Sequence, residues 1–457
     1  MKDVIVIGGG AGGVPAAVRA AQLGGKVAIV ELDDFGGLCM NRSCIPFGHM
    51  MVAAGILGSL DLAKDLGLQI TAVSKDYAAL KKRQDELIKF MRLGVKGMLK
   101  KNNVETVVGA GKIAGPGKVE VNGQVIAARN IILATGGRWL KPDFPGADSE
   151  GVINGDEFLR LDRLPERAFL CGRSPWVLEI AQFLRSFGSE VHLASGDKNI
   201  LSDESKTINS RLRKALTGDG IAVKTRTSVV RVAKKKDGLH VEVGSKGSNE
   251  TVVVDKLIYA DRVAALKGLG LKNVRLDEGA AHIKVSEKME TDVKGVYAIG
   301  DVTGPPARHY SHVSSEGGIV AAENAMGQAA AVNPMTFTRV LFTQPQVACV
   351  GLTPKEAKNA GYDVLSGAAP LSMNPFGMII ADTEGIVEVV ADKRYGEILG
   401  VHFIGRDAAD MAGQAVLAIQ MEATLEDLAR AVFPHPTLSE SLTEAARDAL
   451  GRAIYLP

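Results

Sequence analysis

The N-terminal segment constrains the fold of this chain more than any other feature of the sequence. An apolar stretch, Val4–Ile7, runs directly into the glycine-rich turn Gly8-Gly9-Gly10-Ala11-Gly12-Gly13. A helical stretch, Val14–Leu23, and a second apolar stretch, Val27–Val30, follow, and Glu31 ends the segment. Short apolar runs on either side of an amphipathic stretch predict strand, helix and strand. The segment is therefore expected to form a βαβ unit.

The spacing of the glycines indicates which kind of ligand this unit binds. Gly8, Gly10 and Gly13 follow the pattern G-x-G-x-x-G, in which the residues allow a tight turn, close approach of a pyrophosphate and close helix–strand packing. The helix then offers unpaired N–H groups and the positive end of its dipole to phosphates. Glu31, at the end of the second strand, is placed to accept hydrogen bonds from ribose hydroxyls. The segment predicts a dinucleotide-binding site.

A second unit repeats the architecture without repeating the chemistry. The stretch 168–171 reads as a strand that leads into Gly172, and a helix and another strand end at Ser195 with the same spacing as in the first unit. Ser174 and Val177 replace the second and third glycines, and Ser195 replaces the acid. Ser174-Pro175 is a favourable N-cap and first turn for the helix. We expect this unit to fold normally and to have an altered nucleotide pocket.

Length and composition limit the class of protein. A chain of 457 residues is too long for one core, and 46% hydrophobic with 23% charged residues is typical of globular domains. The net charge of +2 gives no reason to expect nucleic acid as a partner. The stretch Val4–Val18 is too short and too rich in glycine to span a membrane, and four cysteines are too few for a disulfide framework. We expect a cytoplasmic protein that does not insert into membranes.

The order of predicted elements gives an α/β fold class with three domains. Two Rossmann-like nucleotide-binding domains are expected, followed by a C-terminal α+β domain. The expected boundaries are residues 1–147 for the first part of the first nucleotide-binding domain, 148–265 for the second, 266–332 for the second part of the first, and 333–457 for the C-terminal domain.

Two cysteines lie shortly after the first nucleotide unit. Cys39 and Cys44 are five residues apart, which in a regular helix is a rise of about 7.5 Å. That exceeds the usual Cα separation of about 5.5–6 Å in a disulfide. A disulfide therefore needs a distorted first turn, and Pro46 is expected to help by disfavouring helix at Ile45. On spacing alone, a redox pair and two buried thiols are equally good interpretations, and a zinc site is less favoured because no second ligand pair lies nearby.

At this point the chain resembles a known family. Its glycine pattern, the pair Cys39/Cys44 with Ile45-Pro46, and Ala134-Thr135-Gly136 are similar to the FAD-dependent pyridine nucleotide–disulfide oxidoreductases, most closely the dihydrolipoamide dehydrogenase branch. The resemblance covers essentially the whole chain. It continues through Gly300-Asp301, His312-Val313, Phe342-Thr343-Gln344-Pro345 and His435-Pro436-Thr437-Leu438-Ser439-Glu440.

The resemblance implies cofactors, an oligomer and roles for individual residues. FAD is expected to bind, NAD(H) is expected at the second unit, and the last domain is expected to form a homodimer. Cys39 is the sulfur that a substrate thiolate attacks, Cys44 is nearer the flavin, and His435, oriented by Glu440, is the base from the other subunit. Taken alone, Thr437–Glu440 is also a capping box for a helix that continues to Leu450. The expected cofactor-binding residues are Gly8, Gly10, Gly13, Glu31, Ala110, Thr135, Gly136, Asp301 and His312 for FAD, with Glu179 matching a glutamate near flavin N5 and Gly172 in the nicotinamide loop. No metal ligands are predicted.

The sequence departs from the family mainly in the second unit. Phe47-Gly48 stands where members have Ser-Lys, so Glu179 lacks the lysine that would pair with it, unless His49 or Arg42 substitutes. A buried carboxylate without a cation is expected to have a raised pKa. Asp261 lies in Tyr259–Ala264, where members have a glycine, and brings negative charge towards an anionic cofactor.

These observations predict an FAD-dependent dithiol/disulfide oxidoreductase of the dihydrolipoamide dehydrogenase type. Its partner would be a dihydrolipoyl-carrying protein or a small dithiol or disulfide. Two alternatives stay open. In one, the protein has lost ordinary NAD(P)H use and exchanges electrons with a redox protein. In the other, it is a non-catalytic flavoprotein subunit of a multienzyme complex.

Overall fold

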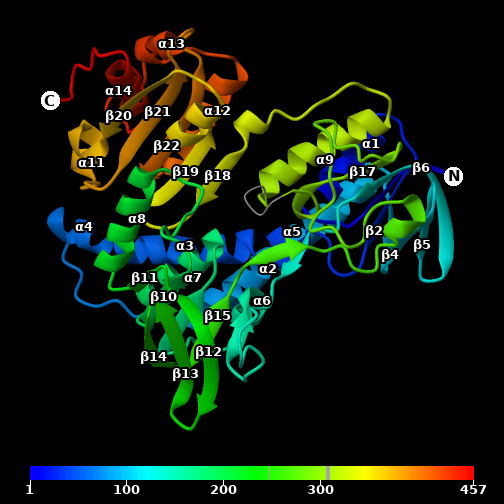
Figure 1. Ribbon diagram of the computed structural model, residues 1–457, viewed down its shortest axis with the longest axis horizontal. Coiled ribbons are helices and arrows are strands. Elements are labelled where there is room, and N and C mark those ends of the chain that lie inside the picture. The colour runs from blue at the N-terminus through cyan, green and yellow to red at the C-terminus, as the bar shows by residue number, and fades with distance from the viewer. Residues whose placement is uncertain (246, 305–308) are drawn as a thin grey trace.

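The computed structural model describes residues 1–245, 247–304 and 309–457. Three lobes are visible, with the N-terminal strands in one lobe and the C-terminal helices in another (Figure 1). The chain leaves the first lobe, builds the second, returns to complete the first, and ends in the third. The α/β class with a separate C-terminal domain, predicted from the sequence, is confirmed.

The first lobe contains a sheet built on the N-terminal βαβ unit. Strand β1 pairs in parallel with β2 and with β6, and β17, from far along the chain, pairs in parallel with β6. The sheet order is β3-β2-β1-β6-β5-β4, and its strands are β1 (Lys2–Ile7), β2 (Val27–Glu31), β3 (Glu105–Val108), β4 (Gly111–Gly115), β5 (Lys118–Val121), β6 (Gln124–Leu133) and β17 (Val296–Ala298). Its helices are α1 (Gly13–Gln22), α2 (Gly37–Arg42), α5 (Tyr77–Lys101) and α9 (Ser311–Ala325). From α2 the chain runs through α3 (Cys44–Gly58) and α4 (Leu60–Asp65) away from this lobe towards the other two (Figure 1).

The second lobe has the predicted repeat of the βαβ unit. Strands β9 and β10 pair in parallel, and the helix α7 connects them along the chain. Ser174 caps this helix by accepting from the N–H of Trp176, and Pro175 is in its first turn. The parallel sheet, β11-β10-β9-β15-β8, contains β8 (Val152–Asn154), β9 (Arg167–Cys171), β10 (Glu190–Ser195), β11 (Ala222–Thr225) and β15 (Lys256–Tyr259). A three-stranded sheet of β12 (Ser228–Lys235), β13 (Gly238–Ser245) and β14 (Ser248–Val254) projects from it, and the helices are α6 (Gly155–Leu159), α7 (Pro175–Phe187) and α8 (Lys206–Gly218).

Two short strands join the first two lobes where the chain crosses between them. Strand β7 (Gly137–Trp139) runs out and β16 (Arg262–Ala264) runs back, and they pair antiparallel with Arg262 opposite Trp139. This pairing places Arg262 and Trp139 at the junction of the lobes.

The third lobe is an antiparallel sheet covered by helices. Its order is β18-β19-β22-β21-β20, with α12 packed on β19 and β22, and α14 packed on β20 and β21. The strands are β18 (Thr338–Leu341), β19 (Gln346–Gly351), β20 (Val364–Pro370), β21 (Ile386–Asp392) and β22 (Ile398–Gly405). The helices are α10 (Pro354–Asn359), α11 (Pro375–Ile379), α12 (Ala408–Gln420), α13 (Leu425–Arg430) and α14 (Glu440–Ala449).

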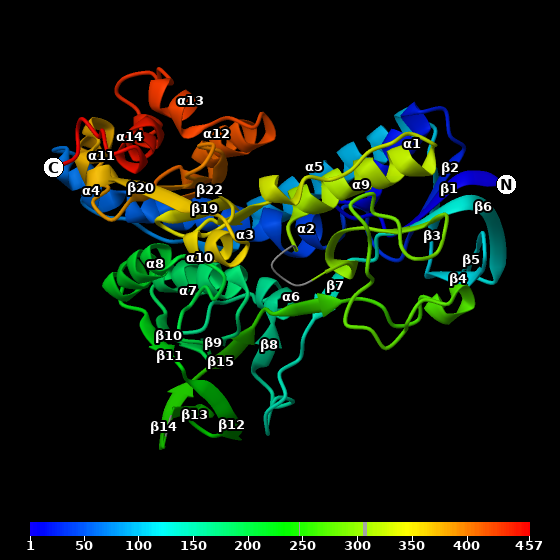
Figure 2. The ribbon, with the colours of Figure 1, turned by 45° about the horizontal axis from the view of Figure 1, so that its top comes forward.

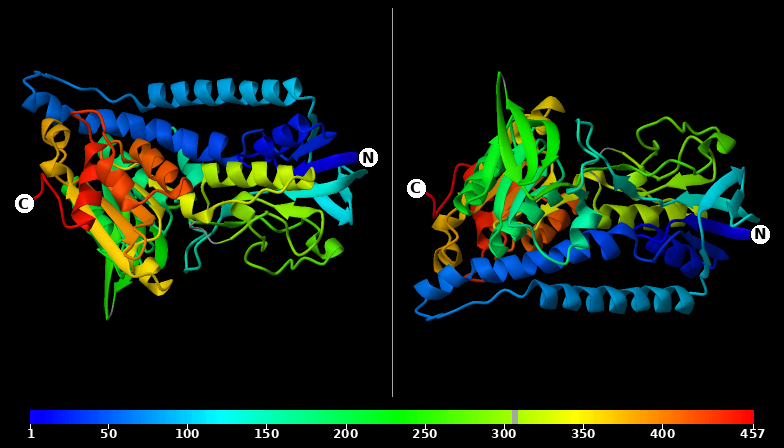
Figure 3. Two further views of the ribbon diagram at one scale, coloured as in Figure 1. Left: turned by 90° about the horizontal axis from the view of Figure 1, so that it is seen from above. Right: turned by 90° about the horizontal axis from the view of Figure 1, so that it is seen from below.

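Helix α3 connects the lobes physically. It lies between the third lobe and α7 of the second lobe (Figures 1 and 2). Helix α5 runs beside it along one side of the molecule (Figure 3). The run Gly37–Asp65, which includes α2, α3 and α4, is long and apolar enough to cross a membrane by length and composition alone. In the fold, part of this apolarity is used in packing, since Phe47, Met50, Met51 and Ala54 are buried in the core that α3 shares with α7.

The surroundings of Gly10 and Gly13 differ in the space that a side chain would have. A Cβ on Gly13 would come within 1.8 Å of the carbonyl oxygen of Gly8, whereas a Cβ on Gly10 would meet nothing nearer than the Cα of Gly37 at 3.6 Å. Gly13 is therefore required for the packing of α1 on β1, and Gly10 leaves space beside the turn.

We predict that Gly13→Ala lowers the free energy of unfolding by roughly 1–3 kcal/mol through overpacking, and that Gly10→Ala changes it little. Urea unfolding of nucleotide-free protein, followed by circular dichroism, measures both variants. Equal urea midpoints for the two variants would contradict this account of the turn.

Candidate active site

One cavity brings together most of the residues that the sequence analysis singled out. It has a volume of about 490 Å³ and extends from the glycine turn to the two cysteines. Nine predicted site residues line it, namely Gly8, Gly10, Glu31, Cys39, Cys44, Ala110, Thr135, Gly136 and Asp301.

The end of the cavity at α1 has the donors that a diphosphate needs. The backbone N–H groups of Gly10, Ala11 and Gly12 donate to no other group within the described ranges, and they lie at the N-terminus of the helix. Glu31 accepts from the N–H of Gly9 at 2.6 Å and from that of Asp33 at 2.9 Å, which fixes its carboxylate at the cavity wall. Free amides at a helix N-terminus with a fixed carboxylate nearby fit the diphosphate and ribose of FAD.

The other end of the cavity carries the two cysteines. Cys39 lies in α2 and Cys44 is the first residue of α3, and both are free thiols. The helices are separated by Ser43, whose φ of −148° and ψ of −93° interrupt the regular backbone. The predicted distortion is present, but the predicted cause is wrong. Ile45 and Pro46 are helical, because a proline in the first turn of a helix loses no hydrogen bond.

The surroundings of the two thiols give them different pKa values. Cys44 Sγ lies 3.1 Å from the hydroxyl of Ser311 and 3.7 Å from that of Ser43. A hydrogen bond from Cys39 lowers the pKa of Cys44 to about 6. Burial acts in the opposite direction, and a hydrogen bond from Ser311 contributes to the lowering. The same hydrogen bond, together with burial, raises the pKa of Cys39 well above its ordinary value. At neutral pH the reduced pair therefore holds its negative charge on Cys44.

Two residues that contact this end of the cavity were not predicted as site residues. Arg262 forms a buried ion pair with Asp301 at 2.9 Å, and its charge helps to lower the pKa of Cys44. Ser311, at the start of α9, supplies the hydroxyl beside Cys44. Arg262 matches the arginine of a family motif and could have been predicted as a site residue from that match. Ser311 is next to His312 but belongs to no sequence motif that would have identified it.

Glu179 is buried on α7, and no cationic side chain among the described residues pairs with it. Its carboxylate accepts the N–H of Phe342 at 3.0 Å, and neither His49 nor Arg42 pairs with it, because Arg42 faces Asp33 and Asp156. Burial, partly offset by the Phe342 N–H, raises the pKa of Glu179 to about 7. The prediction of a raised pKa for this carboxyl is confirmed.

His435 and Glu440 form a pair at the start of α14. His435 Nδ1 lies 3.0 Å from Glu440 Oε1, and the imidazole is 67% exposed. The expected capping box does not form. Glu440 accepts from the N–H of Thr437, but the Thr437 hydroxyl donates to the carbonyl of Pro434. Helix α14 lies far from α2 in both views (Figures 1 and 2), so the pair does not meet the cysteines of its own chain.

The remaining predicted residues lie outside the cavity wall. His312 Nε2 is 2.8 Å from the carbonyl of Thr338 and links α9 to β18. Gly13 lies behind the wall against Gly8, and Gly172 faces Asp261. Thr135, within the wall, donates its hydroxyl to the carbonyl of Ala265 at 3.1 Å.

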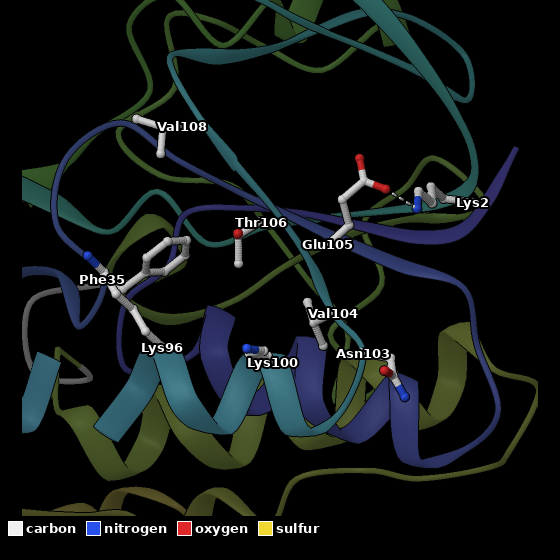
Figure 4. Close-up of a pocket in the computed structure, with 9 residues that line it drawn as sticks. All are labelled: Lys2, Phe35, Lys96, Lys100, Asn103, Val104, Glu105, Thr106 and Val108. Carbon is white, nitrogen blue, oxygen red and sulfur yellow. Dashed lines mark hydrogen bonds and ion pairs between the residues drawn. The ribbon is translucent and has the colours of Figure 1, made fainter. Parts of the chain in front are cut away.

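A second pocket, of about 720 Å³, lies beside β3 and α5 and contains none of these residues (Figure 4). Its lining includes Lys96 and Lys100 on α5 and the ion pair between Lys2 and Glu105, at 2.5 Å. No cysteine or histidine lines it, so the thiol chemistry belongs to the smaller cavity.

A buried cluster at the contact of the second and third lobes contains metal-ligand residue types. Glu204, Cys349 and His402 have their ligand atoms within 4.8 Å of one another. Arg339 already takes the Glu204 carboxylate through two hydrogen bonds of 2.6 and 3.1 Å, and burial raises the pKa of the Cys349 thiol. Because the Arg339 guanidinium binds the Glu204 carboxylate and the Cys349 thiol is protonated, we interpret this cluster as a structural ion pair that joins the lobes and not as a metal site.

The chain matches one family over nearly its whole length. Residues 2–329 match the family described as pyridine nucleotide-disulphide oxidoreductase, and residues 337–446 match the dimerisation domain of that family. A protein named dihydrolipoyl dehydrogenase from Thermus scotoductus is 40% identical over 99% of this chain and 98% of its own length. A protein of the same name from Bacillus subtilis is 32% identical over 99% of both chains.

Solved structures support the fold. The crystal structure of LpdA from Mycobacterium tuberculosis superposes with a TM-score of 0.87 at 23% identity, over 97% of this chain and 99% of that one. A Cu(II) complex of the flavoprotein disulfide reductase RclA from Escherichia coli gives 0.82 at 23% identity, over 97% and 98%. At this identity the likeness concerns the fold alone.

The lowered pKa of Cys44 predicts how the reduced protein reacts with iodoacetamide. The thiolate is the reactive form, so the alkylation rate of Cys44 should be constant above about pH 7 and fall as the pH drops through about 6. Ser311→Ala removes a hydrogen bond to the thiolate and should raise this midpoint by roughly one pH unit. Peptide-resolved mass spectrometry measures the rate.

Ser314→Ala is the matched control, because Ser314 lies on the same helix but donates to the carbonyl of Tyr310. It should leave the midpoint unchanged. A wild-type midpoint near the ordinary value for cysteine would show that the thiolate is not stabilised.

Proposed function

The chain belongs to the pyridine nucleotide–disulphide oxidoreductase family, and we propose that it oxidises or forms protein-bound dihydrolipoyl groups through Cys39 and Cys44. The observation that carries this proposal is the asymmetric thiol pair at the end of the cavity that fits FAD. Relatives named dihydrolipoyl dehydrogenase, at 32–40% identity over the full chain, supply the substrate class.

The asymmetry of the thiols gives each cysteine its role. In thiol–disulfide exchange, the thiol with the lower pKa is the better leaving group. A substrate thiolate that attacks Cys39 in the disulfide form releases Cys44 as a thiolate, which Ser311 and Arg262 stabilise. The second substrate thiol then displaces Cys39, so that the substrate leaves as a disulfide and two electrons stay on the cysteine pair. The cavity that begins at the glycine turn and ends at Cys44 would hold FAD, which would supply the acceptor for that electron pair.

The attacking thiol must first lose its proton. An imidazole with a carboxylate on its Nδ1 side is oriented to accept a proton at Nε2, and the cation that forms is stabilised by the carboxylate. His435 and Glu440 have this arrangement. Because the pair is remote from the cysteines of its own chain, we propose that it serves the active site of the partner subunit.

A homodimer follows from the dimerisation-domain match over residues 337–446. The monomer also exposes large apolar side chains of the kind that subunit interfaces cover. These include Val52 and Ile56 on α3, Phe90 and Leu93 on α5, and Leu417 and Met421 on and beside α12.

We predict that Cys44→Ser abolishes the reduction of bound flavin by dihydrolipoamide, because the exchange disulfide is lost, while FAD remains bound. Anaerobic stopped-flow absorbance measures the reduction, and the ratio of visible to ultraviolet absorbance measures the FAD content. Normal reduction in the variant would rule out the assignment of the redox pair.

We also predict that His435→Gln lowers the rate of reduction by dihydrolipoamide by roughly 10²–10⁴-fold, the usual contribution of a general base. The matched control is His240→Gln, which removes another histidine that pairs with a carboxylate, Asp237, at 2.9 Å on the surface of the second lobe. An equal loss in both variants would contradict a catalytic role for His435.

A further inference from the structure

Family membership implies NAD(H) as the second cofactor, and the turn between β9 and α7 is where its phosphates would bind. This turn corresponds position by position to the glycine turn of the first unit, with Gly172 at the place of Gly8 and Val177 at the place of Gly13. The two turns can therefore be compared amide by amide.

In the second turn, the backbone donors are already used. The N–H groups of Arg173 and Ser174 both donate to Asp261 Oδ1, at 2.8 and 2.7 Å. Pro175 has no N–H, and the N–H of Trp176 donates to the Ser174 hydroxyl at 3.3 Å. In the first turn, the N–H of Gly9, at the place of Arg173, also donates to a carboxylate, that of Glu31. The N–H groups of Gly10, Ala11 and Gly12, at the places of residues 174–176, are not engaged within the described ranges.

The group that occupies the second turn is an anion of the chain itself. Asp261 follows β15, whose parallel pairing with β9 brings the carboxylate to the turn, and Oδ1 lies 2.7 Å from where a Cβ of Gly172 would be. A carboxylate that accepts two amides replaces the hydrogen bonds that a phosphate would make. Its negative charge also opposes the approach of a second anion.

The helix that follows cannot approach its strand as α1 approaches β1. At Gly13 a Cβ would overlap the carbonyl of Gly8, and the equivalent residue, Val177, has a buried β-branched side chain. Ser195 also lacks the carboxylate that would bind a ribose, and its hydroxyl donates to the carbonyl of Asn199 at 3.3 Å.

Aromatic side chains fill the contact between the second unit and the cysteines. The Trp176 ring lies 5.8 Å from that of Trp139 and 6.3 Å from that of Phe47, which is on α3 one turn beyond Cys44. The Arg262 guanidinium lies 3.7 Å from the centre of the Trp176 ring, and Arg262 itself lines the FAD-type cavity. A nicotinamide ring that came from the second unit towards this cavity would meet this aromatic cluster.

We propose that the second dinucleotide-binding unit is closed by the chain's own side chains, with the Asp261 carboxylate in the place of the cofactor phosphates and Trp176 in the path to the flavin. NAD(H) does not fit this unit as it is folded. The unit then acts as a structural domain that buries Glu179 and supports α3, and nicotinamide nucleotides do not exchange electrons with the flavin by this route.

The test is to open the site in the FAD-loaded, full-length protein. Binding of NADH and of NADPH is measured by equilibrium dialysis, and flavin reduction by each nucleotide is followed anaerobically, for wild type, Asp261→Gly, Trp176→Ala and the double variant. Wild type should show no saturable binding of either nucleotide. Asp261→Gly should bind at least one nucleotide saturably, with an affinity at least tenfold above the detection limit that wild type does not reach, and the double variant should also gain flavin reduction.

The control variant is Asp197→Gly. Asp197 carries the same charge and contacts the Arg173 side chain at 3.0 Å, but it accepts no amide of the turn. It should leave nucleotide binding unchanged. Asp261→Asn is the second variant in case Asp261→Gly does not fold, and it should produce a smaller gain in the same direction, because it removes the charge and keeps the side chain.

The proposal is overturned if wild type binds NADH or NADPH saturably, if that nucleotide reduces wild-type flavin as fast as dihydrolipoamide does, or if Asp197→Gly gains as much affinity as Asp261→Gly. It is also overturned if opening the turn changes nothing. Reduction of each variant by dihydrolipoamide is recorded in parallel and tests the dithiol function separately, since dialysis reports nucleotide binding whether or not the flavin is reduced.

Discussion

The chemistry of this molecule depends on the position of one sulfur atom. Cys44 is the first residue of α3, where helix amides favour a negative charge, and the Ser311 hydroxyl and the Arg262 guanidinium add to that preference. The break at Ser43 separates α2 from α3, and the thiols of Cys39 and Cys44 interact by a hydrogen bond although they belong to different helices. Because the same thiol lies in the wall of the cavity that starts at the glycine turn, the βαβ unit, the dithiol and the return of the chain through Ser311 form one site.

The two nucleotide-binding units show that a fold can be repeated while its site is changed. Both have parallel strands around a helix whose N-terminus meets a tight turn. In the first, the free amides of Gly10, Ala11 and Gly12 line a cavity. In the second, Asp261 accepts the amide of Ser174, which is at the place of Gly10, together with that of Arg173. The substitutions also compensate one another structurally: Ser174 caps α7, Trp176 packs on Arg262, and Phe47 occupies the place where the family has the start of Ser-Lys. Fold and function separate here because the βαβ fold depends on strand pairing and helix packing, which both units have, whereas the site depends on which group the turn amides bind.

Much of this could be predicted from the sequence because the signals are local. Apolar runs and glycine spacing gave the strands of both βαβ units, and the Ser174-Pro175 cap was predicted correctly. The raised pKa of Glu179 followed from an absent lysine. What could not be predicted depends on distant residues: Ser311 reaches Cys44 from far along the chain, and Asp261 reaches the turn only through the pairing of β15 with β9. The capping box at Thr437 failed for a local reason: α14 begins at Glu440, so Thr437 is not at the N-cap position, and its hydroxyl donates to the carbonyl of Pro434.

The central claim is that reducing equivalents reach the flavin through the Cys39/Cys44 pair. The most direct test is an anaerobic titration of the FAD-loaded protein with dihydrolipoamide, in which the electrons taken up per flavin are counted and free thiols are assayed at the end point. The account predicts an uptake twice that of a flavin alone, with Cys39 and Cys44 both recovered as thiols. An uptake equal to that of a flavin alone, with the cysteines unchanged, would contradict it.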